Sequence, residues 1–86
     1  MNRLRRNALK EIAVKLQEME ALRDEIIEDL QQVLDEEQEA YDNLSEGIQN
    51  SERGDQMQEY IDAMDDILNE LEYVDITQWT DTLSEI

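Results

Sequence analysis

The chain has 86 residues, enough for one small domain that buries only a limited share of its surface. It contains no cysteine, no histidine and no proline, which excludes disulfides, thiolate chemistry and imidazole bases. The net charge of −17 repels nucleic-acid phosphates and anionic membranes and attracts basic protein surfaces. We therefore expect no direct nucleic-acid or membrane partner and no cofactor.

The first predicted element is a long helix over about residues 3–41. Its composition is dominated by strong helix formers, and apolar residues recur three and four positions apart. Arg23 and Glu37 interrupt this stripe at positions where an apolar residue is expected. The stripe consists of Leu9, Ile12, Leu16, Met19, Ile26, Leu30 and Val33, widened by Leu22, Ile27 and Leu34.

A connection is predicted over residues 42–51, where serines, asparagines and Gly47 are concentrated. Ser51 is the expected N-cap of a second helix over about 52–74. The apolar phase then shifts near Asp75, and the helix either continues or breaks into a short helix over 77–86. Length favours continuation, because a helix over 52–86 would match the first one.

These elements predict an all-α fold: one domain, residues 1–86, forming an antiparallel two-helix hairpin of long, coiled-coil-like helices. Facing residues then have numbers that sum to about 94, which places Leu16 near Trp79. The basic segment 1–15 lies alongside Asp81 and Glu85. Two helices cannot cover each other's apolar stripes, so the hairpin is expected to pair with a second copy as a four-helix bundle homodimer.

The acidic residues are the feature that most needs an explanation, because like charges recur three and four positions apart and repel each other. One interpretation is a solvated face that maintains solubility. The other is a surface for a basic partner, including mimicry of the phosphates of DNA. The candidate acidic face comprises Asp24, Glu28, Asp35, Glu39, Asp62, Asp66 and Glu70.

Metal binding and catalysis find little support. Residues 42–53 begin with Asp42 and carry a glycine at the sixth place, as a calcium loop does, but Leu44 and Arg53 occupy ligand positions. No metal site and no catalytic residue is predicted, and the chain is not expected to be an enzyme. Trp79 either fills a seam between helices or copies, which we favour, or acts as an anchor for a partner.

The stretch from Asp35 to Gly54, DEEQEAYDNLSEGIQNSERG, resembles a family of small acidic helical proteins encoded by phages and prophages. That family commonly has a proline where this chain has Ser45. The resemblance implies a phage-type setting and no activity. Without cysteine and without an export signal, the expected location is the cytoplasm, here that of the host cell. The resemblance also makes the hairpin tip a candidate recognition surface, with Asp42, Asn43, Glu46, Glu52 and Arg53 as its polar residues. The equal alternative is that a tight helix–loop–helix requires similar residues for packing alone.

From the sequence we therefore expect a non-enzymatic accessory protein that binds a host or phage protein through its acidic face or its tip. A sharper version is an inhibitor of a nucleic-acid enzyme or a defence protein. The alternative is a structural helical oligomer with no inhibitory role.

Overall fold

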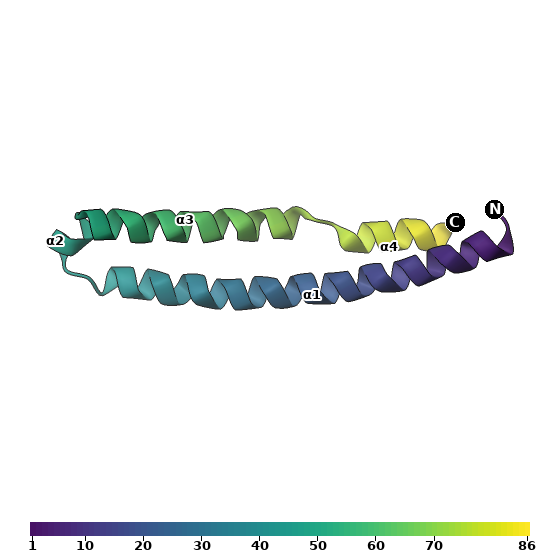
Figure 1. Ribbon diagram of the computed structural model, residues 1–86, viewed down its shortest axis with the longest axis horizontal. Helices are drawn as coiled ribbons and strands as arrows, with labels where there is room; N and C mark the ends of the chain where they lie inside the picture. Colours follow the sequence, from purple (N-terminus) through teal and green to yellow (C-terminus); the bar gives the residue numbers. More distant parts are fainter.

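A computed structural model describes residues 1–86, and it confirms the all-helical class. The elements are α1 (Arg3–Asp42), α2 (Glu46–Gln49), α3 (Glu52–Tyr73) and α4 (Ile76–Glu85). Helices α3 and α4 both pack along α1, and the short helix α2 joins the two layers at one end (Figure 1). None of the helices combines the length and the apolar content needed to cross a membrane.

The molecule is a rod that measures 68 × 14 × 13 Å along its principal axes. Its radius of gyration is 20.0 Å, whereas a compact domain of this length would have roughly 12 Å. The shape follows from α1, because 40 helical residues at about 1.5 Å each span about 60 Å. A rod two helices thick has little interior, and only six residues are buried.

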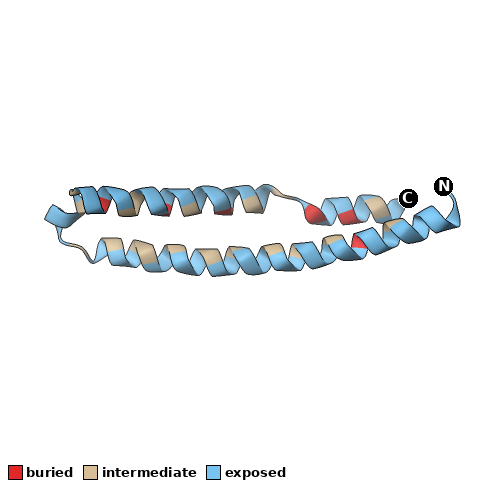
Figure 2. Ribbon diagram, viewed as in Figure 1, coloured by how far each residue is buried: buried red, intermediate tan, exposed pale blue.

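The buried and half-buried residues form one seam between α1 and the α3–α4 layer (Figure 2). Its buried apolar members are Ile61, Leu68 and Ile76 of the second layer and Ala13 of α1. Cross-layer hydrogen bonds fix the register: Arg23 donates to the carbonyls of Leu71 and Val74, and Thr77 Oγ1 donates to Glu20 at 2.8 Å.

The register is close to the expected one, because the residue numbers of these pairs sum to between 94 and 97. The basic segment 1–15 lies at the end of the rod that α4 occupies, with its first turns extending beyond the C-terminus (Figure 1). However, none of its side chains approaches Asp81 or Glu85 within ion-pair distance, since Arg23–Asp24 is the only salt bridge. The basic side chains of α1 and the carboxylates of α4 therefore lie at the same end of the rod but form no ion pairs.

The second layer does not continue as one helix, contrary to what length favours. The chain leaves α3 at Val74, which is extended, and α4 begins after Asp75, whose carboxylate accepts a hydrogen bond from the Gln78 amide at 3.0 Å. An N-capping aspartate and the two-residue step between the apolar side chains Val74 and Ile76 both favour an interruption. The alternative of a separate final helix, expected from Thr77, is what the structure has, one residue earlier.

Thr80 provides a first test of this seam. It lies on the inner side of α4, only 6% exposed, and its hydroxyl has no hydrogen-bond partner. A buried unpaired hydroxyl costs on the order of 1–3 kcal/mol. We expect Thr80→Val, which keeps the shape and removes the hydroxyl, to raise the free energy of unfolding by about 1 kcal/mol in urea titrations. Thr80→Ala should not show this gain, because it also removes a methyl group from the seam.

Candidate functional site

The exposed surface of the rod divides into two faces of opposite character. In α1, Ile12, Met19, Ile26 and Val33 each lie three positions after a seam residue, which rotates them by about 60° to one side of the seam. Leu22 lies one position before the seam residue Arg23, which places it on the same side. The same offset holds in α3 and α4. Because the two layers run in opposite directions, the same rotation brings both sets to one side of the rod. We call this the apolar face, and it comprises Ile12, Met19, Leu22, Ile26, Val33, Tyr60, Ile67, Trp79 and Ile86.

A groove in the middle of the rod shows that the two layers share this face. It has a volume of about 240 Å³, and six of its seven lining residues are hydrophobic. Met19, Leu22 and Ile26 of α1 lie on one side of it, and Leu71 and Val74 lie on the other. Met19, Leu22 and Ile26 are between 44% and 56% exposed, so the groove is open to solvent. Tyr73 and Val14 are also exposed, but their spacing places them away from this face.

The candidate acidic residues lie on the opposite side. Asp24, Glu28, Asp35, Glu39 and Asp62 each follow a seam residue by one position, a rotation of about 100° in the other direction around the helix. In α1, Asp24, Glu28, Asp35 and Glu39 line one shallow hollow along the helix. Asp62 occupies the equivalent side of α3, and Asp66 and Glu70, two positions after a seam residue, point away from the seam. We call these seven residues the acidic face.

Glutamines hold part of the acidic face in place. Gln31 donates to Asp35 at 2.9 Å, and Gln58 donates to Asp62 at 3.1 Å, each across one turn. A glutamine donor orients an aspartate without neutralising it. Asp24 is the only member with a cation partner, since Arg23 Nε lies 2.9 Å from its carboxylate. The remaining six carboxylates carry their charge uncompensated.

The tip is more compact than a flexible connection. Gln49 of α2 donates to the carbonyl of Tyr41 at 3.0 Å, which ties α2 to the end of α1. Gly54 is buried against the same residue, and a Cβ there would lie 2.1 Å from the Gln49 carbonyl oxygen. Ser51 is the N-cap of α3 by position, but its hydroxyl donates to the Ile48 carbonyl and makes no cap bond. Backbone and side-chain contacts therefore fix the shape of the tip.

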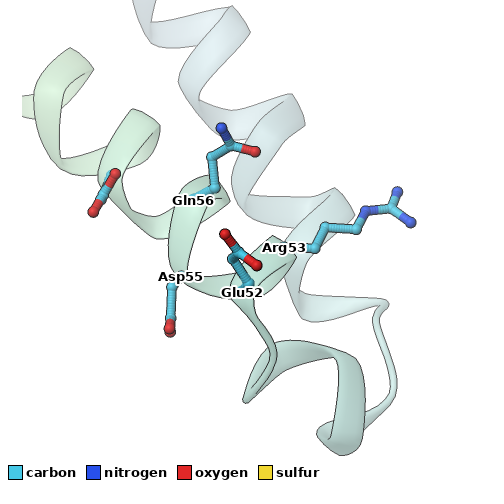
Figure 3. A pocket seen from close by; sticks show the side chains of 5 residues that line it. Glu52, Arg53, Asp55 and Gln56 are labelled. Carbon is cyan, nitrogen blue, oxygen red and sulfur yellow. The ribbon is translucent and has the colours of Figure 1, made fainter.

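The five predicted tip residues are all exposed, but the structure does not gather them into one cluster. Asp42 ends α1 and Asn43 is its C-cap, whereas Glu46 begins α2. Glu52 and Arg53 lie at the start of α3 beside Asp55 and Gln56, around an open hollow (Figure 3). The Arg53 side chain extends away from Glu52 and forms no ion pair.

Trp79 lies on the apolar face and is 47% exposed, so it does not fill the seam within one chain. From this position Trp79 can pack against a second copy of the chain or anchor a different partner. Sequence reasoning missed the role of Arg23, which it treated only as an interruption of the stripe. One signal in the sequence could have indicated this role. Arg23 is a cation at a seam position, and the predicted register places it opposite the point near Asp75 where the spacing of the second apolar stripe changes.

The structure offers no enclosed catalytic cleft, and no group of three or more acidic side chains has a metal-binding arrangement. What the two faces can do chemically is to bind: one by burial of apolar surface, the other by charge. Comparisons with known protein families, curated proteins and solved structures give no match to this chain.

Proposed function

We propose that this protein is a non-enzymatic, phage-type accessory protein whose acidic face binds a basic surface of another protein. In this proposal the chain acts as an antiparallel hairpin of coiled-coil-like helices. The partner is a host or phage protein, with a nucleic-acid enzyme or a defence protein as the sharper version, and binding inhibits it. The phage-type setting, and with it the host cell as the location, rests on the resemblance of residues 35–54.

The observation that carries the proposal is the uncompensated charge of the acidic face. Six of its seven carboxylates lack a cation within 4.0 Å. A sequence selected for stability alone would alternate its signs at these spacings, because like charges one turn apart destabilise a helix. A partner with basic side chains would remove that repulsion on binding.

The charge density supports mimicry of DNA as the form of this binding. A net charge of −17 over a rod 68 Å long amounts to about one charge per 4 Å of length. One strand of DNA carries a phosphate about every 3.4 Å along the helix axis, and the duplex carries one about every 1.7 Å. A groove that contacts one strand would therefore meet a comparable linear charge.

The test compares two variants with the same net charge. The first removes charge from the acidic face with Asp35→Asn, Glu39→Gln and Asp62→Asn, which keep an oxygen that can accept from the glutamines. The control removes three charges elsewhere with Glu11→Gln, Glu18→Gln and Asp29→Asn, all at exposed positions. Both variants, with the unaltered chain, are used to capture proteins from host cell extract at about 0.1 M and about 1 M salt, with mass spectrometry of what is retained.

We expect a partner that is captured by the unaltered chain and by the control, is lost with the acidic-face variant, and is released at high salt. Screening over about 3 Å at 1 M salt would abolish such an interaction. Competition by duplex DNA for the captured protein would support mimicry. Equal capture by all three chains would contradict the proposal. If substituting Asp42, Asn43, Glu52 and Arg53 alone abolished capture of the partner, the recognition surface would be the tip and not the acidic face.

The apolar face favours a second candidate function, a structural or assembly part in which the helices build an oligomer. The two candidates differ in their response to salt. An oligomer held by apolar contacts persists or strengthens at 1 M salt, whereas the electrostatic complex dissociates.

A further inference from the structure

The exposed apolar stripe of α1 is symmetric about its own midpoint. Ile12 and Val33 lie equally far from a point between Leu22 and Arg23, and so do Met19 and Ile26. Leu22 lies half a residue from that point. A stripe with this symmetry is complementary to itself when a second copy is turned end over end, which is the requirement for a twofold interface.

We propose that the apolar face binds a second copy of this chain in one defined arrangement, with the two tips at opposite ends of the assembly. In it, α1 packs antiparallel on α1 of the partner copy. Ile12 meets Val33, Met19 meets Ile26, and the two Leu22 side chains meet on the twofold axis. This inference fixes orientation and register, and it does not depend on the acidic face having any partner.

The break between α3 and α4 lies at the same level along the rod as the midpoint of the α1 stripe, because Arg23 of α1 donates to the carbonyls of Leu71 and Val74 there. The twofold axis that relates the two α1 stripes therefore also passes near the break. As a result, α3 of each copy lies over α4 of the other. The two open grooves face each other at the centre, and Trp79 of each copy comes to the level of the partner α3, within a turn of Ile67.

Charge selects this orientation over the one with both tips at the same end. Residues 1–15 carry five basic side chains and one acidic side chain, whereas residues 30–44 carry five acidic and no basic ones. The antiparallel register places each basic segment at the level of the partner's acidic segment. The other orientation would place basic beside basic and acidic beside acidic, which long-range repulsion disfavours.

The exposed area is sufficient for such an interface. The accessible surface is 6699 Å², whereas a compact monomer of 10.2 kDa would expose about 5,300 Å². The excess of about 1,400 Å² exceeds the roughly 800 Å² that each partner contributes to a standard interface. The rod therefore has the spare surface that a stable dimer needs.

The test exploits the absence of cysteine from the chain, so that any cysteine introduced is unique. Leu22→Cys should form a disulfide-linked dimer under mild oxidation, because the two sulfurs meet at the axis. Ile12→Cys alone and Val33→Cys alone should not, because 21 helical residues place the two copies of each about 30 Å apart. An equimolar mixture of Ile12→Cys and Val33→Cys should form the mixed disulfide.

Sedimentation equilibrium of the unaltered chain should give twice the monomer mass of 10.2 kDa. Ile26→Lys should shift this equilibrium to the monomer with helical circular dichroism retained, because Ile26 is 44% exposed in the single chain. Gln17→Lys, exposed on the opposite side of α1, should leave the dimer intact. A monomer at every concentration would overturn the proposal, and so would a dimer in which the mixed pair fails to cross-link.

Discussion

Replacing Arg23 by leucine is expected to lower the free energy of unfolding by about 2–4 kcal/mol, although it restores the apolar pattern of α1. The Arg23 side chain is 17% exposed and donates to two backbone carbonyls where α3 ends. Each hydrogen bond to a charged donor contributes about 1.5–3 kcal/mol, and carbonyls left unpaired in the seam add a desolvation cost. The positive charge also lies at the negative end of the α3 dipole.

Glu37 provides the matched comparison, because it is the other polar interruption of the same stripe. It is half-buried in the seam and has no hydrogen bond or ion pair. Glu37→Leu should therefore raise the free energy of unfolding by about 1 kcal/mol, since a half-buried leucine contributes part of the 1.5–3 kcal/mol of a fully buried one.

Both substitutions are measured by urea unfolding with far-UV circular dichroism at one protein concentration, because the dimer that we propose would make the apparent stability depend on concentration. Arg23→Lys should recover only part of the loss, since an ammonium group lacks the planar fork of the guanidinium. If Arg23→Leu stabilised the protein as Glu37→Leu does, the role of Arg23 at the break would be wrong.

The second large effect is expected at the tip, where Gly54→Ala should lower the free energy of unfolding by about 1–3 kcal/mol. Its Cβ would lie 2.1 Å from the Gln49 carbonyl oxygen and 2.7 Å from that of Ile48. Both are backbone atoms, so relief requires α2 to move as a unit. Overpacking of this kind typically costs 1–3 kcal/mol, which exceeds the gain of up to about 1 kcal/mol from alanine in a helix.

Gly47→Ala is the control, because a Cβ at that position meets nothing within 4 Å. It should leave stability unchanged or slightly raised, with alanine favoured over glycine in a helix. Hydrogen exchange of the amides of Ile48 to Ser51 would locate the effect: faster exchange in Gly54→Ala and unchanged exchange in Gly47→Ala. Equal behaviour of the two variants would show that the close packing of the tip does not matter for its stability.

The helices themselves could be predicted from the sequence, because their signals are local. The three-four spacing and the strong helix formers indicated α1 within one residue of its observed end at Asp42. Gly47 in the connection and Ser51 before Glu52 indicated where the second helical layer begins. The approximate register also followed, because two long helices joined by a short connection have few ways to align.

Only the tertiary structure decided the roles of individual residues within those helices. Spacing cannot show that Arg23 bonds to α3 while Glu37 bonds to nothing, because both occupy the same kind of position in the stripe. Spacing alone also left a continuous second helix and a break near Asp75 both open, and the structure shows the break, with Arg23, 51 residues away in sequence, donating to the Val74 carbonyl.

The separation into an apolar and an acidic face shows the same division between sequence and structure. The sequence determined that each helix has an apolar stripe wider than one neighbour can cover, together with an acidic one. Which half of each stripe is covered was decided by how α3 and α4 rotate about α1, since that rotation buries Ile61 and Leu68 and leaves Tyr60 and Ile67 in solvent. The physical reason is that periodicity fixes positions around a single helix, whereas the direction of contact between helices is set by packing.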